Sequence, residues 1–195
     1  MVMHRRKEVD QLPDDEIIRL ILHEDRRELM EVLYDRYAAK VYHKCLGVIG
    51  DKPAAQDLAH DVMLKIFLNL ATFRRESDFR FWVYSITYNQ CMDYLKKKKR
   101  LQHYDLDLTN YSNLSAQDIE MENKVLAELR YSQLERLLKE LKEEDRLILL
   151  MRYQDSMPMK EIARILSITE SAVKMRLRRS LDRLSERVKK EQHEE

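Results

Sequence analysis

Apolar residues recur at the three- and four-residue spacing of a helix through the first hundred residues of the chain. The pattern predicts four helices, which begin near Asp14, Leu29, Ala54 and Phe79. Asp14 or Asp15 is expected to cap the first helix, and Gly47 to Pro53 are expected to separate the second from the third. The fourth helix runs into a group of lysines that begins at Lys96.

The second half of the chain changes in character at residue 101. Residues 101–125 mix Asn, Ser, Thr and acidic residues without sustained periodicity, which predicts a linker. Leucines at helical spacing return between residues 126 and 151. In the strongest local motif, Pro158 starts a short helix, Ser167 to Thr169 make a tight connection, and Glu170 to about Lys190 form a longer helix. This arrangement is typical of a helix-turn-helix.

Two details of this motif can be predicted. Thr169 should cap the longer helix, because its hydroxyl can accept a hydrogen bond from an otherwise unpaired backbone N–H. Ser167 should form the turn without needing a positive φ. An apolar seam is expected to hold the two helices together: Ile162, Ala163, Leu166, Ile168, Val173 and Leu177. The opposite face of the longer helix then points outward, as in a helix that enters the major groove of DNA.

The composition indicates an all-α chain with two cores. The 195 residues include only two glycines and three prolines, too few for the turns that a sheet protein needs. Charged residues make up 36% of the chain, as in amphipathic helices whose polar faces meet water. We therefore expect two small helical domains, residues 1–100 and 126–195, joined by a flexible linker at 101–125.

Other residues of chemical interest point to a cytoplasmic protein without a metal site. Cys45 and Cys91 lack a CxxC pairing and are expected to be reduced and buried. The first residues have no signal-peptide pattern, and no apolar run is long enough to span a membrane, so no membrane insertion is expected. His43, His60 and His103 have no metal-binding spacing, and we expect neither a metal nor another cofactor.

Positive charge is concentrated in two places, although the net charge of the chain is only +1. Between Lys174 and Lys190 lie eight basic residues and two acidic ones, and this excess coincides with the longer helix of the helix-turn-helix. Lys96 to Arg100 form a second run of five. The first patch has the size of a nucleic-acid contact, whereas a lysine run is also common at a solvated helix end.

Three segments, in this order and at this spacing, resemble the extracytoplasmic-function (ECF) group of sigma factors. They are AAQDLAHDVMLKIFLNLATF, FRFWVYSITYNQCMDYLKKKKR and LKEEDRLILLMRYQDSMPMKEIARILSITESAVKMRLRRSLDRL. They are similar, respectively, to the family's polymerase-binding helix, its promoter-melting and −10 helix, and its −35 domain. The resemblance implies a sigma factor that directs core RNA polymerase to promoters and has no catalytic site. The implied partners are the polymerase, through the coiled coil of its largest subunit and its flap, and promoter DNA; whether an anti-sigma factor exists stays open.

The resemblance also assigns roles to individual residues. The polymerase-facing set is Asp57, His60, Asp61 and Leu64. The set for −10 DNA is Asn69, Thr72, Phe73 and Arg74 in or beside the loop that holds a flipped base, Asn89 on the neighbouring helix to complete that pocket, and the cations Arg80, Lys96 and Lys97. The set for the −35 duplex is Ser171, Lys174, Met175, Arg178 and Arg179.

The chain departs from the family pattern within the helix-turn-helix. Ser167 stands where the family often has glycine, and Ala172 stands where threonine is usual. Met175 replaces a small polar residue, and Pro158 replaces a Ser or Thr cap. None of these forbids the fold, since proline is accepted in a first helical turn. They leave the −35 sequence unpredictable from the resemblance.

Other classes of function stay open at this point. The helix-turn-helix would also fit a transcriptional regulator that binds duplex DNA without polymerase, and a helical adaptor is a further alternative. Asp57 and Asp61 could hold magnesium in an all-helical nucleotide pyrophosphohydrolase, although such a site would need more acidic residues nearby. Phe79 and Trp82 are interpreted as core residues, while Phe73 fits either the core or a DNA contact.

Overall fold

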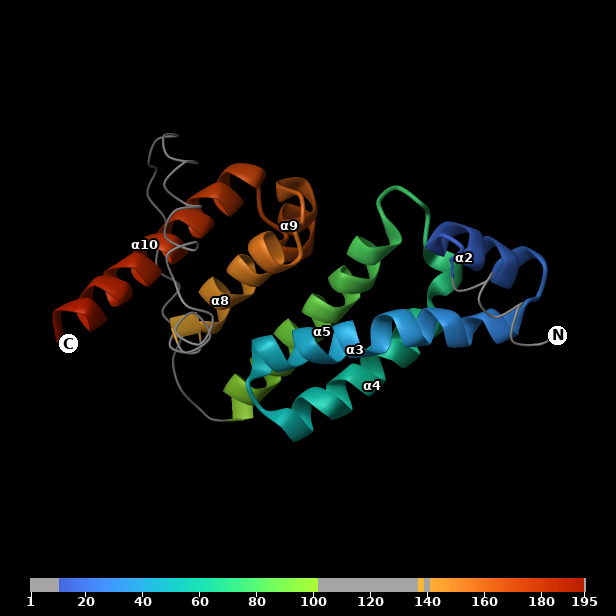
Figure 1. Cartoon of the computed structure of the whole chain (residues 1–195), viewed down its shortest axis with the longest axis horizontal. Coiled ribbons are helices and arrows are strands. Elements are labelled where there is room, and N and C mark those ends of the chain that lie inside the picture. The colour runs from blue at the N-terminus through green and yellow to red at the C-terminus, as the bar shows by residue number, and fades with distance from the viewer. Residues whose placement is uncertain (1–10, 102–136, 139–140, 195) are drawn as a thin grey trace. The chain divides into compact units, whose positions relative to one another are not determined.

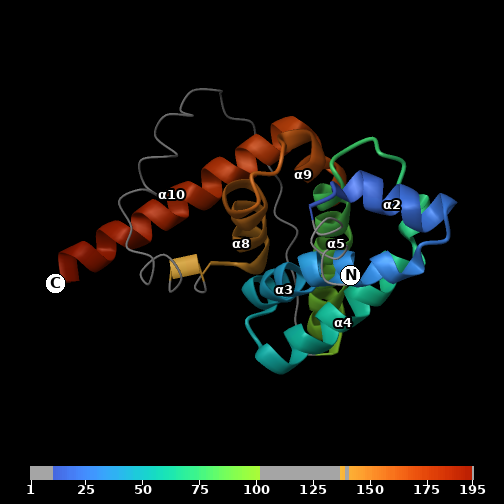
Figure 2. The same ribbon diagram turned by 45° about the vertical axis from the view of Figure 1, so that its right-hand side comes forward.

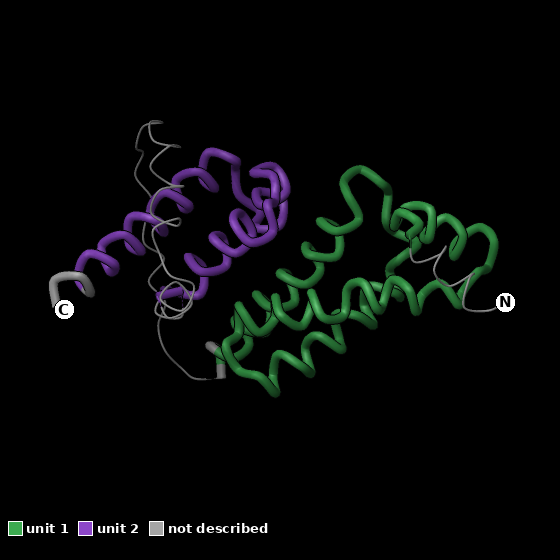
Figure 3. Tube along the Cα trace, viewed as in Figure 1, with its two compact units in different colours: residues 1–102 green, residues 103–195 purple. Residues whose placement is uncertain are grey.

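The structure is a computed structural model that describes residues 11–101, 137–138 and 141–194. All regular elements within these residues are helices, so the predicted all-α fold is confirmed (Figure 1). The chain divides into two compact units, residues 1–102 and 103–195 (Figure 3). The linker predicted at 101–125 lies outside the described residues apart from Leu101, and so does the leucine repeat as far as residue 136.

The N-terminal unit contains the four predicted helices. They are α2 (Asp14–His23), α3 (Met30–Ile49), α4 (Lys52–Leu68) and α5 (Phe79–Leu101), with short 3-10 turns at Arg27–Leu29 and Leu70–Thr72. In both views α3, α4 and α5 lie against one another (Figures 1 and 2). Their shared core holds side chains that water scarcely reaches: Leu33, Val41, Cys45, Val48, Val62, Ile66, Leu70, Tyr88 and Cys91. The expected burial of both cysteines is confirmed.

The first helix, α2, is held to its unit by Asp14. The prediction that Asp14 or Asp15 caps this helix is wrong, because Pro13 precedes it and no side chain caps it. The Asp14 carboxylate instead accepts hydrogen bonds from Arg36 Nη1, at 2.6 Å, and from the Tyr37 hydroxyl, both on α3. A charged guanidinium and a hydroxyl together outweigh a single backbone N–H as partners for a carboxylate. Burial, together with this carboxylate, raises the pKa of Tyr37.

The helix α3 runs further than the sequence predicted. Gly47 lies inside it, and the helix ends at Gly50, whose φ of +75° is a left-handed conformation that glycine adopts without a steric cost. Asp51 then caps α4 by accepting a hydrogen bond from Ala54 N–H at 2.9 Å. Only one of the two glycines therefore breaks the helical pattern.

The C-terminal unit confirms the predicted helix-turn-helix. Its elements are α8 (Glu143–Leu149), a π-helical turn (Leu150–Gln154), α9 (Met159–Leu166) and α10 (Glu170–Glu194). Both α8 and α9 pack on α10. Ile162, Val173 and Leu177 of the predicted seam have no exposure to water. Since α10 is one continuous helix, its first turns are supported by contacts made further along it.

The connection between α9 and α10 differs from the prediction at one residue. Ser167 has φ +54° and ψ +42°, so the expectation that this turn needs no positive φ is wrong. A side chain makes left-handed backbone cost roughly 1 to 2 kcal/mol. Thr169 acts as predicted: its hydroxyl accepts a hydrogen bond from Ala172 N–H at 3.2 Å.

Replacing Ser167 by glycine should stabilise the C-terminal unit by about 0.5 to 1 kcal/mol. Glycine adopts the left-handed turn without the steric cost, and its greater freedom in the unfolded chain offsets part of the gain. Urea unfolding of the full chain, followed by circular dichroism, measures the change. Ser167→Ala keeps the Cβ and is the matched control, which should not be stabilised. A glycine variant no more stable than the alanine variant would contradict the steric account.

Candidate protein and nucleic-acid interfaces

One face of α4 exposes the residues that the resemblance assigns to polymerase binding. Asp57, His60, Asp61 and Leu64 are all exposed. They recur at the three- and four-residue spacing that places side chains on one side of a helix. Leu68 continues this α4 stripe and is 84% exposed, against 51% for Leu64. Leu68 was not predicted, although its spacing of four from Leu64 was a signal. Exposed leucines beside carboxylates make a surface suited to a protein partner.

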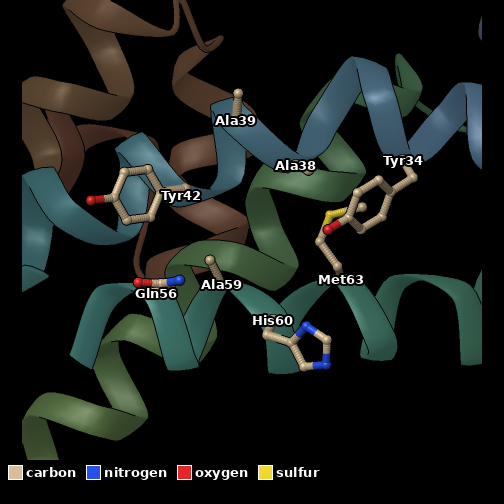
Figure 4. A pocket seen from close by; sticks show the side chains of 8 residues that line it. All are labelled: Tyr34, Ala38, Ala39, Tyr42, Gln56, Ala59, His60 and Met63. Atoms are coloured by element: carbon tan, nitrogen blue, oxygen red, sulfur yellow. The ribbon is translucent and has the colours of Figure 1, made fainter. Parts of the chain in front are cut away.

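A pocket of about 470 Å³ lies between α3 and α4, next to the α4 stripe. Its lining residues are Tyr34, Ala38, Ala39, Tyr42, Gln56, Ala59, His60 and Met63. Figure 4 shows side chains of both helices around it, with the ring of Tyr34 beside Met63. His60 belongs to both the pocket and the stripe, and Tyr34 is 46% exposed. The pocket therefore extends the exposed apolar surface of α4 onto α3.

The loop that follows α4 is fixed by its own hydrogen bonds. Asn69 Nδ2 donates to the carbonyl of Lys65 at 2.8 Å, and Thr72 Oγ1 donates to the carbonyl of Asn69 at 2.7 Å. Thr72 and Arg74 are exposed, whereas Asn69 is half-buried. The structure thus brings together, in one short turn, three of the polar residues implied to surround a flipped base.

Phe73 points into the core rather than out of this loop. It is only 8% exposed, and the centroid of its ring lies 5.1 Å from that of Phe79 and 5.6 Å from that of Trp82. Phe79 in turn stacks on Trp82 and meets Tyr37 edge to face. Aromatic pairs favour these arrangements. In this structure the Phe73 side chain is therefore a core residue. Trp82, which was interpreted as a core residue, is half-buried.

Two further cations near the loop are held by contacts within the unit. Arg75, which was not predicted, has φ +56° and donates from Nη2 to the carbonyl of Asp15 at 3.2 Å. This bond joins the loop to α2. Arg80 lies 3.8 Å from Asp78, and its guanidinium stands over the ring of Phe81. Nothing in the sequence pattern singles out Arg75, because its partner is a backbone atom sixty residues away.

Asn89, Lys96 and Lys97 lie further along α5, and all three are exposed. Ten residues separate Asn89 from Phe79, which corresponds to about 15 Å along the helix axis. Among the described residues no hydrogen bond joins Asn89 to the loop. Lys96 lies 4.0 Å from Asp93, but both side chains are largely exposed and the pair contributes little. Of the residues assigned to −10 DNA, Asn69, Thr72, Phe73 and Arg74 thus lie at or after the end of α4, and Arg80, Asn89, Lys96 and Lys97 lie along α5.

The helix α10 separates a buried stripe from an exposed one. Val173 and Leu177 have no exposure and face the other helices of the unit. Of the five residues implied for −35 DNA, Ser171, Lys174 and Arg178 are exposed, and Met175 and Arg179 are half-buried. The structure thus brings all five onto the first three turns of α10, with two of them at the border of the seam.

Asp145 of α8 supports α10 from the opposite side. Its carboxylate accepts a hydrogen bond from Ser180 Oγ at 2.9 Å and pairs with Arg183. Ser180 is fully buried, although it is polar. A serine within the apolar stripe between Leu177 and Leu184 was the sequence signal for such a contact. Arg183 belongs to the basic patch by sequence, but its guanidinium pairs with Asp145 of the same unit.

The described residues offer little to the magnesium alternative. Among them, no three or more His, Cys, Asp or Glu side chains are arranged to hold a metal ion. Asp57 and Asp61 therefore lack, in this part of the chain, the additional acidic residues that such a site needs.

None of the described helices combines the length and the apolar character needed to cross a membrane.

Two family models match the chain. Sigma-70 region 2 matches residues 33–101, and Sigma-70, region 4 matches residues 131–184; together they cover more than half of the sequence. The chain belongs to the sigma-70 family. In this sigma factor the first match spans nearly all of α3 together with α4 and α5, and the second includes the whole helix-turn-helix seam.

Curated relatives place the sigma factor in the ECF group, as the sequence predicted. The ECF RNA polymerase sigma factor SigW of Bacillus subtilis is 28% identical over 164 residues, which cover 80% of this chain and 87% of SigW. The ECF RNA polymerase sigma-E factor of Escherichia coli is 25% identical over 187 residues, covering 92% of this chain and 96% of that protein.

Two solved structures share the fold. The sigma factor RpoE of Bartonella quintana, in co-crystal with the anti-sigma factor NepR, has a TM-score of 0.61 at 18% identity and covers 82% of this chain and 96% of its own. CnrH, in complex with the cytosolic domain of CnrY, has a TM-score of 0.60 at 16% identity, with coverage of 90% and 97%. The family matches make this chain a transcription initiation factor that acts with core RNA polymerase at promoters. They favour neither a polymerase-independent regulator nor a pyrophosphohydrolase.

The burial of Phe73 leads to a test. Phe73→Ala should lower the free energy of unfolding by about 3 to 5 kcal/mol, as expected for a phenylalanine removed from a packed core. Thr72→Ala, at the exposed neighbouring position, should change it by no more than about 0.5 kcal/mol. Urea unfolding can be followed by the fluorescence of Trp82, the one tryptophan of the chain. Equal stability of the two variants would show that Phe73 is not part of the core.

Proposed function

We propose that the two units of this sigma factor divide promoter recognition between them. The N-terminal unit binds core polymerase through the α4 stripe and holds the unwound −10 strand along the loop and α5. The C-terminal unit reads the −35 duplex with α10. The polymerase carries out the chemistry, and the sigma factor contributes no catalytic group. The observation that carries this division is the sorting of exposed residues, apolar and acidic on α4 and basic on α10.

The helix α10 has the shape and charge for the major groove. An α-helix fits this groove, where long cationic side chains reach base edges and flanking phosphates. Lys174 and Arg178 are exposed and one turn apart. Met175, at the border of the seam, is suited to apolar contact with a thymine methyl group. The contact of Asp145 with Ser180 keeps the reading face on a fixed support.

The α4 stripe fits a helical partner such as the coiled coil of the largest polymerase subunit. Leu64 and Leu68 form a ridge that can pack into the groove of another helix. Asp57 and Asp61 lie on the same face and would pair with basic side chains of the partner. The pocket between α3 and α4 would receive one of its larger side chains, since it is lined mainly by small and aromatic residues.

The −10 strand is proposed to lie against the loop that follows α4 and along α5. Asn69, Thr72 and Arg74 supply polar groups at the loop, and Asn89 contacts the strand further along the helix. Arg80, Lys96 and Lys97 neutralise phosphates on the way. Single strands are commonly bound in this manner, by a basic track that follows the backbone. Phe73 supports the loop through its contacts with Phe79 and Trp82.

Three further assignments belong to the same proposal. The C-terminal unit also contacts the polymerase flap. The protein works in the cytoplasm, where the polymerase acts. An anti-sigma factor is a third partner, because the structures of RpoE and CnrH are complexes with NepR and with a domain of CnrY. Such a protein would compete with polymerase for the exposed apolar surface of α3 and α4.

Replacing Arg178 and Arg179 together by alanine should reduce −35-dependent transcription by about tenfold or more, because each specific Arg–base contact contributes about 1 to 3 kcal/mol. Binding to core polymerase should be unchanged. The promoters are first found by sequencing transcripts that the reconstituted polymerase makes from genomic DNA. Run-off transcription then compares promoters with an intact and a scrambled −35 element.

The matched control for this experiment is Lys142→Ala. It removes an exposed positive charge from the same unit but outside α10. Transcription by this variant should stay at the level of the unchanged protein. The proposed division of labour fails if the double arginine variant loses core binding as strongly as it loses transcription.

Replacing Leu64 and Leu68 together by alanine should weaken binding to core polymerase by about tenfold or more, since burying each leucine in the complex contributes about 1.5 kcal/mol or more. Stability should be nearly unchanged, because both side chains are exposed in the free protein. A titration of fluorescently labelled sigma factor with core polymerase measures the affinity. Leu22→Ala, at a 40% exposed leucine on α2, is the control and should bind normally. Unchanged affinity of the double variant would remove the α4 stripe from the interface.

A further inference from the structure

Two thiols face each other in the core of the N-terminal unit. Cys45 belongs to α3 and Cys91 to α5, 46 positions later, and their Sγ atoms are 3.9 Å apart. Neither residue has any exposure to water, and both thiols are free. These are the only two cysteines in the sequence. Each is therefore the other's sole possible partner for a disulfide within the chain.

We infer that Cys45 and Cys91 form a reversible modification site, at which a low-molecular-weight disulfide such as oxidised glutathione converts the two thiols into one disulfide bond between α3 and α5. The inference is independent of how the two units share promoter recognition. The disulfide would be a covalent bond, cleaved by reductants, in a unit that is otherwise held together by packing and polar contacts.

The two sulfur atoms lie in contact but further apart than in a disulfide bond. A disulfide requires its sulfur atoms about 2.05 Å apart and the Cα atoms of its cysteines within about 7 Å of each other. Starting from 3.9 Å, the sulfurs must approach by roughly 2 Å, which rotation about χ1 and a small helix shift can supply. Two other contacts keep α3 and α5 together: Tyr37 meets Phe79 edge to face, and Lys44 Nζ lies 3.9 Å from the ring centroid of Tyr84.

The reaction is two successive thiol–disulfide exchanges. One cysteine thiolate attacks a sulfur of the small disulfide, which releases one small thiolate and leaves a mixed disulfide on the protein. The other cysteine loses its proton, and its sulfur displaces the second small thiolate from the mixed disulfide. In sum, the two cysteines lose two protons and two electrons, and one small disulfide is reduced to two thiols. Excess thiol reverses both steps.

The core location sets the rate of this reaction. The thiolate is the attacking species, and the hydrogen bond to Cys45, together with burial, raises the pKa of the Cys91 thiol. The small disulfide also cannot reach sulfur atoms that have no exposure. The exchange therefore proceeds through openings in which α3 and α5 separate locally. The disulfide consequently forms only during an opening, and its rate of formation measures how often α3 and α5 separate.

The test uses the full chain, reduced and then incubated with excess oxidised glutathione at neutral pH, with and without about 1 M urea. Intact mass and alkylation of the remaining thiols are followed over time. The expected product is the monomer lacking two hydrogen atoms, with no free thiol and no glutathione attached, and it should form faster in urea. Its thermal midpoint should be higher by about 10 °C, because the bridge restricts the unfolded chain, and dithiothreitol should abolish the difference.

The controls are Cys45→Ala and Cys91→Ala, each of which leaves one thiol. Each should yield a glutathione adduct or a linked dimer, with no comparable rise in the thermal midpoint. The unchanged chain decides the question by itself if either variant fails to fold. A chain that stays reduced, or that accumulates glutathione adducts or linked dimers in place of the internal bridge, overturns the inference. A bridged product with a lowered thermal midpoint overturns the claim that the bridge fits the α3–α5 packing.

Discussion

Tyr37 is the point at which the parts of the N-terminal unit meet. Its hydroxyl donates to Asp14 of α2, while its ring meets Phe79 at the start of α5. Phe79 also contacts Phe73 of the preceding loop and stacks on Trp82. One α3 side chain therefore links α2, α5 and the loop. The polar end of the ring is satisfied by a carboxylate, so its burial leaves no unpaired hydroxyl, and the aromatic contacts add directional packing. The exposed polar groups of the loop depend on this cluster because Phe73 anchors them.

In the C-terminal unit, apolar packing and polar contacts together fix the orientation of α10. Val173 and Leu177 bury the first turns of α10 against its neighbours, but apolar packing alone permits some rotation of a helix about its axis. The hydrogen bond from Ser180 to Asp145 and the ion pair with Arg183 are directional and oppose this rotation. Ser180 directly follows Arg179, the last of the residues proposed to face DNA, and Arg183 lies about one turn further along α10. The orientation of the reading face is thus set by residues that do not belong to it.

Helical periodicity predicted the elements where a helix buries one face, as α4 and α9 do, because that requirement leaves a regular mark in the sequence. Prediction failed where the conformation of a residue depends on a partner that is remote in sequence or on the backbone geometry of a turn. Asp14 has the residue type of a cap, but Arg36 and Tyr37 compete for its carboxylate from another helix. Ser167 is left-handed although serine itself does not signal a positive φ; the glycine common at this position in the resembling family was the available signal. Phe73 has polar neighbours in sequence and aromatic ones in space. Exposure of Asp57 and Asp61 followed from spacing, and that of His60 and Leu64 from the family resemblance, whereas the pocket beside them required the packing of α3.

The distribution of charge bears on the order in which partners bind. Long-range attraction to DNA follows the net charge and its layout, and the whole chain carries only +1. The basic residues of α10 act at short range, while the carboxylates of Asp57 and Asp61 on α4 are repelled by phosphate and attracted by basic protein surfaces. A more basic chain would bind duplex DNA indiscriminately, since that binding is dominated by phosphate neutralisation. If α10 reads DNA and the α4 stripe binds polymerase, as proposed, the near-neutral balance favours DNA reading after the acidic and apolar surface has bound its protein partner.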